Sequence, residues 1–192
     1  MSEVMQVTLT WKQVELAGWT GMHRQIRAVV EDRKGIAEQP NDAPFFQNHL
    51  EGAMGEVAVA TALRLPWSGI QDQVGEDRTP DVGDLLQVRT TGKVDKFSGE
   101  PAWPVRRKDP DHHFMVMVFG RCPTYYLQGW IPIGEAKKIG EWSSKGNGRP
   151  PAWWIVRQQL KPMKQLPAVL AAALVLDDDE PLIVLQPGAR TH

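Results

Sequence analysis

Three short segments of the sequence carry residue types that could act together on a phosphate ester. Glu56 stands in an otherwise apolar stretch, Asp81 follows Pro80, and Gln87 and Arg89 are separated by one residue. Carboxylate and amide oxygens bind hard cations such as Mg²⁺, and an arginine guanidinium binds phosphate. Each residue also has an ordinary structural interpretation, as an ion-paired glutamate, a turn aspartate, or a polar side chain on an edge strand. The spacing therefore defines a candidate site.

The order of these segments resembles the PD-(D/E)XK superfamily of restriction-endonuclease-like nucleases. In that layout, a helix with a glutamate precedes a Pro-Asp pair and then a strand with an acidic residue, any residue and a lysine. The resemblance extends over residues 49–91 of this chain. It implies an α/β fold of the α+β mixed-sheet kind. The restriction-endonuclease-like core would have N-terminal helices packed on a central mixed β-sheet.

The resemblance also implies a role for each residue in a phosphodiesterase that depends on Mg²⁺ or Mn²⁺. Asp81 would be the principal metal ligand, and Glu56 would hold a metal-bound water or a second metal ion. Gln87 and the Val88 carbonyl would complete the ligand shell, and Arg89 would orient the water or stabilise charge in the transition state. The implied function is DNA cleavage, as an endonuclease or exonuclease of a phage, a mobile element, or a restriction or repair system.

Two positions depart from the family pattern. Gln87 replaces the acidic residue and brings no charge to a metal, and Arg89 replaces the lysine. Arginine holds its proton up to a pKa of about 12, so it cannot act as a general base, although it can bind phosphate. Asp84, which follows Asp81 across Gly83, is a candidate for the missing carboxylate. The alternative functions are a catalytically degenerate fold that binds nucleic acid or a protein, and an interaction domain with a tryptophan-rich surface.

Charge changes sign along the chain at the candidate site. The segment 72–84 is rich in acidic residues, whereas residues 89–108 are predominantly basic. A phosphodiester substrate would need this combination of metal ligands and a basic flank. The alternative is that residues 93–108 form a solvated loop. The candidate nucleic-acid contacts are His49, Lys93, Lys96, Arg106, Arg107, Lys108, Lys145 and Arg149.

Local patterns predict the elements that would position these segments. Helical spacing of apolar residues predicts a first helix that follows an N-cap at Thr8 or Thr10 and extends to residue 30, and a second helix over 45–63. Alternating or continuous apolar runs predict strands over 85–91, 114–119, 125–131, 153–156 and 182–185. Shorter helices are expected over 133–139 and 167–176, and residues 34–43 are expected to form a loop.

The composition is typical of one globular domain: 192 residues, 42% hydrophobic and 23% charged, with a formal net charge of -1. We expect a single domain over 1–192, with a helical extension over 1–40 and a C-terminal appendage over 157–192. The single cysteine, Cys122, excludes an internal disulfide and is expected to be a buried or half-buried thiol. We expect most of the eight tryptophan side chains to pack in the core or at its edge.

The charge balance and the apolar runs limit the kinds of partner that the chain can bind. A net charge of -1 excludes a polycation, so binding of DNA would need a local basic patch. The longest apolar run is too short to span a membrane. With a single cysteine, we expect a cytoplasmic protein. The resemblance implies DNA as its partner, and a protein partner or a homodimer is a further possibility.

Overall fold

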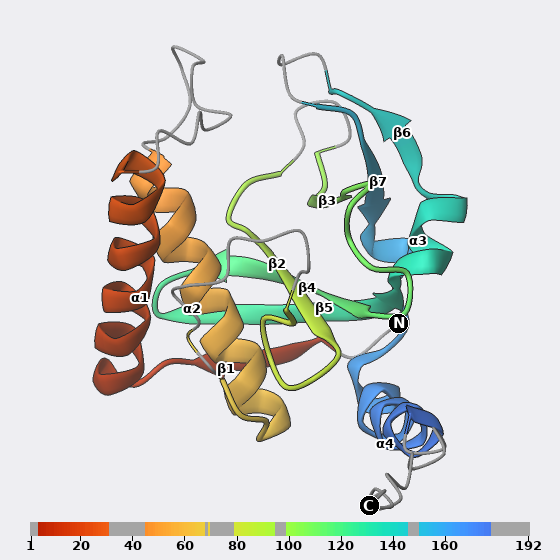
Figure 1. Cartoon of the computed structure of the whole chain (residues 1–192), viewed down its shortest axis with the longest axis horizontal. Helices are drawn as coiled ribbons and strands as arrows, with labels where there is room; N and C mark the ends of the chain where they lie inside the picture. Colours follow the sequence, from red (N-terminus) through yellow and green to blue (C-terminus); the bar gives the residue numbers. More distant parts are fainter. Residues whose placement is uncertain are drawn as a thin grey trace, which may run out of the picture.

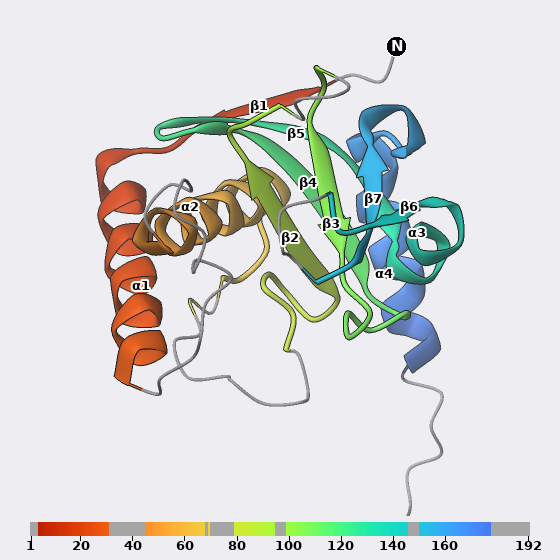
Figure 2. The ribbon, with the colours of Figure 1, turned by 90° about the horizontal axis from the view of Figure 1, so that it is seen from above.

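The computed structural model of the protein describes residues 4–30, 45–67, 69, 79–94, 99–145 and 150–177. Two long helices lie on one side of a central sheet, and a smaller sheet lies on the other side (Figures 1 and 2). The elements in chain order are β1 (Met5–Thr8), α1 (Trp11–Val30), α2 (Phe45–Leu63), β2 (Leu86–Thr91), β3 (Ala102–Val105), β4 (Phe114–Arg121), β5 (Thr124–Pro132), α3 (Ile133–Ile139), β6 (Glu141–Ser143), β7 (Ala152–Val156), the short 3₁₀ helices η1 (Arg157–Gln159) and η2 (Met163–Gln165), and α4 (Leu166–Asp177).

The central sheet is mixed, which confirms the predicted α+β class. Its strand order is β1-β5-β4-β2, in which β2 runs parallel to β4 and the other neighbours are antiparallel. The apolar run of β4 lies inside the sheet, where both of its faces are covered. β2 is an edge strand, so one side of its backbone is open to side chains from other segments.

Glycines bring α2 close to the central sheet and α1 close to α2. A Cβ atom at Gly55 of α2 would lie 1.8 Å from the Thr90 hydroxyl oxygen of β2. A Cβ atom at Gly21 of α1 would lie 2.8 Å from the Leu50 Cα of α2. Only glycine permits approaches of this kind. The close contact at Gly55 places the next residue, Glu56, beside the open edge of β2.

The second sheet covers the opposite face of the central sheet. It is antiparallel with strand order β3-β7-β6. Trp103 of β3 and Ile155 of β7 pack with Met115 and Met117 of β4 in a second core. The Trp103 indole N–H donates to the Val118 carbonyl at 3.0 Å and so connects the two sheets. β4 therefore contributes side chains to both cores.

The longer elements match the sequence predictions closely, and the short ones were missed. α3 has the predicted bounds, and β4 is two residues longer than predicted, because it ends at Arg121 and not at residue 119. Thr10 is the N-cap of α1, because its hydroxyl accepts the Gln13 N–H and its own N–H donates to the Gln13 side chain. The strands β1, β3 and β6 were not predicted; they are three or four residues long. So short a strand carries too little alternation to be recognised.

The prediction for Cys122 is wrong, because the cysteine is exposed in the tight turn between β4 and β5. Trp103 and Trp130 are buried, but Trp11, Trp19 and Trp142 are exposed. The predicted loop at 34–43 and the predicted strand at 182–185 lie outside the described residues. Within the part of the chain that is described, no helix is long and apolar enough to cross a membrane. The restriction-endonuclease-like core and the division into a core with two extensions stay predictions.

Candidate functional site

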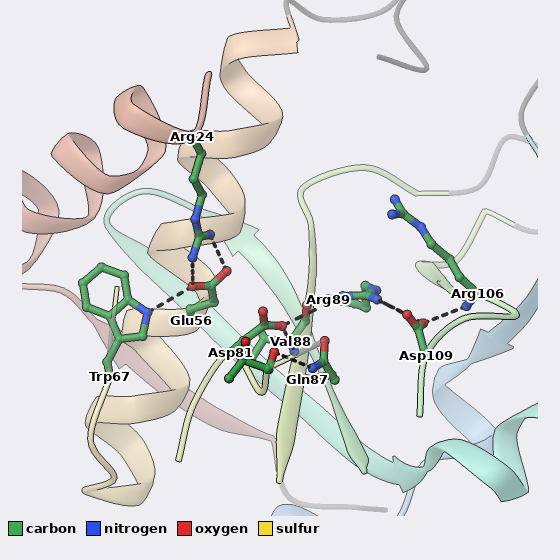
Figure 3. Close-up of polar contacts among 10 residues, drawn as sticks. Arg24, Glu56, Trp67, Asp81, Gln87, Val88, Arg89, Arg106 and Asp109 are labelled. Atoms are coloured by element: carbon green, nitrogen blue, oxygen red, sulfur yellow. Dashed lines mark hydrogen bonds and ion pairs between the residues drawn. The ribbon is translucent and has the colours of Figure 1, made fainter. Parts of the chain in front are cut away.

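Glu56 lies on α2 with its carboxylate fully engaged (Figure 3). The Arg24 guanidinium from α1 binds both carboxylate oxygens, at 2.6 and 2.8 Å, and the Trp67 indole N–H donates to one of them at 3.0 Å. The residue is only 5% exposed. A bidentate, charge-assisted pair of this kind is the strong form of carboxylate binding. Neither Arg24 nor Trp67 was recognised in the sequence, because both are distant from Glu56 along the chain.

Asp81 lies at the open edge of β2. Its backbone N–H donates to the Leu86 carbonyl at 2.7 Å, and its side chain accepts the Val88 N–H at 2.7 Å. The Val88 carbonyl accepts from the Arg89 guanidinium at 3.1 Å. The edge of β2 is thus closed by two side chains, one acidic and one basic, instead of by another strand.

The Asp81 carboxyl group has an unusual protonation equilibrium. Burial, and then the negative charge of Glu56, raise the pKa of Asp81 to about 6. The Arg89 guanidinium, the Val88 N–H and Arg24 act in the opposite direction but do not compensate. The raised pKa therefore reflects first the burial of the carboxyl group and second the neighbouring charge of Glu56.

Gln87 and Arg89 lie on the face of β2 opposite α2. Their partners in the parallel register are Met115 and Met117, which belong to the core between the two sheets. Gln87 is 2% exposed, and its amide donates to the Thr79 carbonyl at 3.1 Å. The predicted common face of positions 87 and 89 is present.

Arg89 connects the edge of β2 to a second buried carboxylate. Its guanidinium donates to both oxygens of Asp109 at 3.0 Å, and it lies 4.0 Å from the Asp81 carboxylate. Asp109 also accepts the Arg106 backbone N–H at 2.7 Å (Figure 3). The side chain of Asp109 is completely buried. This role was not recognisable from the sequence, because Asp109 stands among basic residues that are typical of a solvated turn.

The predicted metal ligands come together only in part. The charge of Glu56 acts on Asp81, whereas Asp84 is an exposed turn residue and Gln87 donates its amide to the backbone. Among the described residues, no group of three or more His, Cys, Asp or Glu side chains forms a metal-binding cluster. Both oxygens of Glu56 already bind donors. This arrangement does not fit a metal site unless Arg24 withdraws from Glu56.

The predicted nucleic-acid contacts separate into several regions. His49 is half-buried on α2, and Lys93 is exposed just after β2. Arg106, Arg107 and Lys108 are exposed on the loop between β3 and β4, directly before Asp109. Lys145 follows β6, with its ammonium group 5.6 Å from the centre of the Trp154 ring. Lys96 and Arg149 lie outside the described residues.

An aromatic pair lies beside the basic loop. Trp142 of β6 and Trp153 of β7 are paired across the strands, with ring centres 4.4 Å apart. The Arg107 guanidinium lies 5.6 Å from the Trp142 ring, and the Lys137 ammonium lies 5.9 Å from the Trp153 ring. Trp154 points to the other face of β7, because successive strand residues alternate. Lys145 therefore belongs to a different face from the Trp142 pair.

Lys137 fixes the basic loop in this position. From α3, its ammonium group donates to the Arg107 carbonyl at 3.1 Å and to the Asp109 carbonyl at 2.6 Å. It also pairs with the Asp111 carboxylate at 2.5 Å. The loop is thus held on one side by Lys137 and on the other by the contacts of Asp109 with Arg89.

Neither the models of known protein families, nor the curated proteins, nor the solved structures contain a match to this chain.

Proposed function

We propose that the protein binds nucleic acid without cleaving it, through a PD-(D/E)XK-like domain with a degenerate centre. The observation that carries this proposal is the position of the Arg89 guanidinium, between the Val88 carbonyl, the Asp81 carboxylate and Asp109. A metal-dependent phosphodiesterase would need a divalent cation near these oxygens. A fixed guanidinium supplies positive charge there instead, and it cannot accept a proton from water.

Binding of nucleic acid is supported by the surface next to this centre. The loop with Arg106, Arg107 and Lys108 offers cations for phosphate groups. Trp142, 45% exposed and with Arg107 over its ring, offers a surface on which an unpaired base can stack. Because stacking needs an unpaired base, we infer that the preferred ligand is single-stranded.

A second candidate is the Mg²⁺-dependent nuclease, and Asp81 favours it. Burial and then the charge of Glu56 raise the pKa of Asp81 to about 6, and a divalent cation near the two carboxylates would relieve the part of this rise that comes from Glu56. In this case Arg24 would have to release Glu56 when the cation binds.

Fluorescence anisotropy with a labelled single-stranded oligonucleotide and the matching duplex tests the first candidate. We expect tighter binding of the single strand and affinity that falls with salt. Trp142→Ala should weaken binding by about fivefold to 150-fold, because stacking contributes about 1–3 kcal/mol per base. Arg107→Ala should reduce the slope of the logarithm of the binding constant against the logarithm of the salt concentration by about one, because one phosphate contact is lost. Lys164→Ala, which removes an exposed charge on η2, is the matched control and should bind as the wild type does.

Incubation of the same oligonucleotides with Mg²⁺ or Mn²⁺ separates the two candidates. Intact DNA after binding supports the degenerate centre. Cleavage that disappears in both Glu56→Ala and Asp81→Ala would support the nuclease instead. Cleavage that persists in both variants would indicate a contaminant. Absence of binding at low salt, together with intact DNA, would contradict both candidates.

A further inference from the structure

The outer face of α1 exposes large apolar side chains. Figures 1 and 2 show α1 at the edge of the molecule, with α2 between it and the central sheet. Trp11 and Val30 are 79% and 78% exposed, and Leu16, Trp19 and Ile26 are at least half exposed. Single exposed apolar residues are ordinary, but a continuous apolar patch on a soluble domain indicates a binding surface.

The exposed residues follow the spacing of a helix that packs against a second helix. Successive positions are four, three, four, three and four residues apart, which keeps them on one side of the helix. All six side chains are exposed, and four of the six are apolar. We refer to this set as the α1 stripe; its members are Lys12, Leu16, Trp19, His23, Ile26 and Val30.

We propose that two copies of this chain form a dimer through the α1 stripe, with the two α1 helices antiparallel about a two-fold axis at residue 21. The stripe is symmetric about that residue, so each position meets a different member of the stripe. Leu16 would face Ile26 of the second copy, and Trp19 would face His23 of the second copy. An interface that is complementary to itself in this way closes as a two-fold dimer.

The charge of Lys12 favours the antiparallel direction. A parallel pair would set the ammonium group of Lys12 against that of Lys12 in the second copy, and two like charges side by side in an interface are unfavourable. In the antiparallel pair Lys12 faces Val30 at either end, where its ammonium group can reach water while its stem covers apolar surface. Antiparallel helices also place opposite ends of their macrodipoles side by side.

The area of the stripe is sufficient for a small interface. From the exposed fractions, and from side-chain areas of about 150–250 Å² for aromatic residues and somewhat less for aliphatic ones, the four apolar members of the α1 stripe offer on the order of 400 Å² per copy, and the exposed Lys12 and His23 add on the order of 150 Å². The two copies together would bury roughly 1,100 Å², near the lower limit of about 1,000 Å² for a specific interface. We therefore expect a reversible dimer.

The proposed dimer does not depend on binding of nucleic acid. Arg24 reaches Glu56 from another side of α1, toward α2. β6, which carries the exposed Trp142, lies on the side of the molecule opposite α1 (Figures 1 and 2), so Trp142 stays exposed in the dimer.

Analytical ultracentrifugation of the full chain over a range of concentrations tests the dimer. We expect a reversible change from monomer to dimer. Trp19→Glu should raise the dissociation constant at least about 100-fold, because the change occurs twice at the centre of the interface. Leu174→Glu changes an exposed leucine on α4 and should leave the dissociation constant unchanged. Circular dichroism of both variants checks that they fold.

A monomer at every concentration would overturn the proposal, and so would equal effects of the two substitutions. Disulfide cross-linking tests the direction of the helices, in a Cys122→Ser background that removes the only native thiol. A mixture of Leu16→Cys and Ile26→Cys chains should cross-link, whereas either chain alone should not. Cross-linking of each chain with itself would show a parallel pair and overturn the antiparallel arrangement.

Discussion

At the scale of single residues, the candidate site is a set of carboxylates matched to arginines. Arg24 neutralises Glu56, and Arg89 neutralises Asp109, each through two hydrogen bonds. The Asp81 carboxylate lies 4.0 Å from the same Arg89 guanidinium, and it accepts a hydrogen bond from the Val88 backbone N–H. The pKa of Asp81 rises mainly through burial and then through the Glu56 charge, and its contacts with Arg89 and the Val88 N–H do not offset this rise.

The Asp81 carboxyl group should make the stability of the protein depend on pH. Its pKa is about 6 in the folded protein, above the ordinary value of 3.8, so between these pH values the folded state keeps a proton that the unfolded state loses. The free energy of unfolding should therefore fall as the pH rises through this interval, by at most about 3 kcal/mol from this group. Asp81→Asn keeps an oxygen for the Val88 N–H and should remove this contribution.

Urea denaturation of the wild type and of Asp81→Asn between pH 4 and pH 7 measures the effect. The variant should gain stability relative to the wild type as the pH rises. Because both proteins share all other titrating groups, the difference between them reports Asp81 together with its interaction with Glu56. A difference that stays constant over this range would contradict the raised pKa.

At the scale of elements, the site depends on how closely α2 approaches β2. Gly55 contacts Thr90 directly, whereas Gly52, on the same helix, has no atom within 4 Å of a Cβ placed there. The two glycines therefore serve different purposes. Gly55 permits the contact that places Glu56 beside the sheet, and Gly52 only weakens the helix.

Alanine substitutions at the two glycines should have opposite effects. Gly55→Ala should lower the free energy of unfolding by about 1–3 kcal/mol, because its methyl group would overlap Thr90. Gly52→Ala should raise it by roughly 1 kcal/mol through helix propensity. Chemical denaturation of both variants provides the measurement. If Gly55→Ala were as stable as Gly52→Ala, the close packing of α2 on β2 would be wrong.

At the scale of the whole molecule, one strand joins two cores. Val116 and Val118 of β4 face the helices, and Met115 and Met117 face the second sheet. Trp103 is fully buried in the second core and donates its indole N–H to the Val118 carbonyl. The second sheet, which carries the Trp142 pair, is thus coupled to the sheet that carries Asp81 and Arg89.

This coupling predicts that the two sheets unfold together. Trp103→Ala should lower the free energy of unfolding by about 3–5 kcal/mol, through lost packing and a cavity. Trp103→Phe should lower the free energy of unfolding by less, about 1–3 kcal/mol. It keeps most of the packing, but it leaves the Val118 carbonyl without the indole donor. Far-ultraviolet circular dichroism and tryptophan fluorescence should report one shared transition in both variants. Two separate transitions would show that the sheets are independent.

The sequence by itself determined the longer elements and the faces of β2. The alternation around Gln87 and Arg89, the apolar run of β4 and the helical spacing of α2 are local patterns, because each depends on side chains a few residues apart. Glu56 and Asp81 were recognised for the same reason, since their segments carry a compact motif.

Only the tertiary structure decided which charges meet. Arg24, Trp67 and Asp109 reach the site from other segments, and local spacing contains no information about such contacts. β3 pairs with β7, far along the chain, so its four residues form a strand only because a partner is present. The sequence named Glu56 and Asp81 but not Asp109. Folding assigned an arginine to Glu56 and to Asp109, and it left Asp81 with a raised pKa.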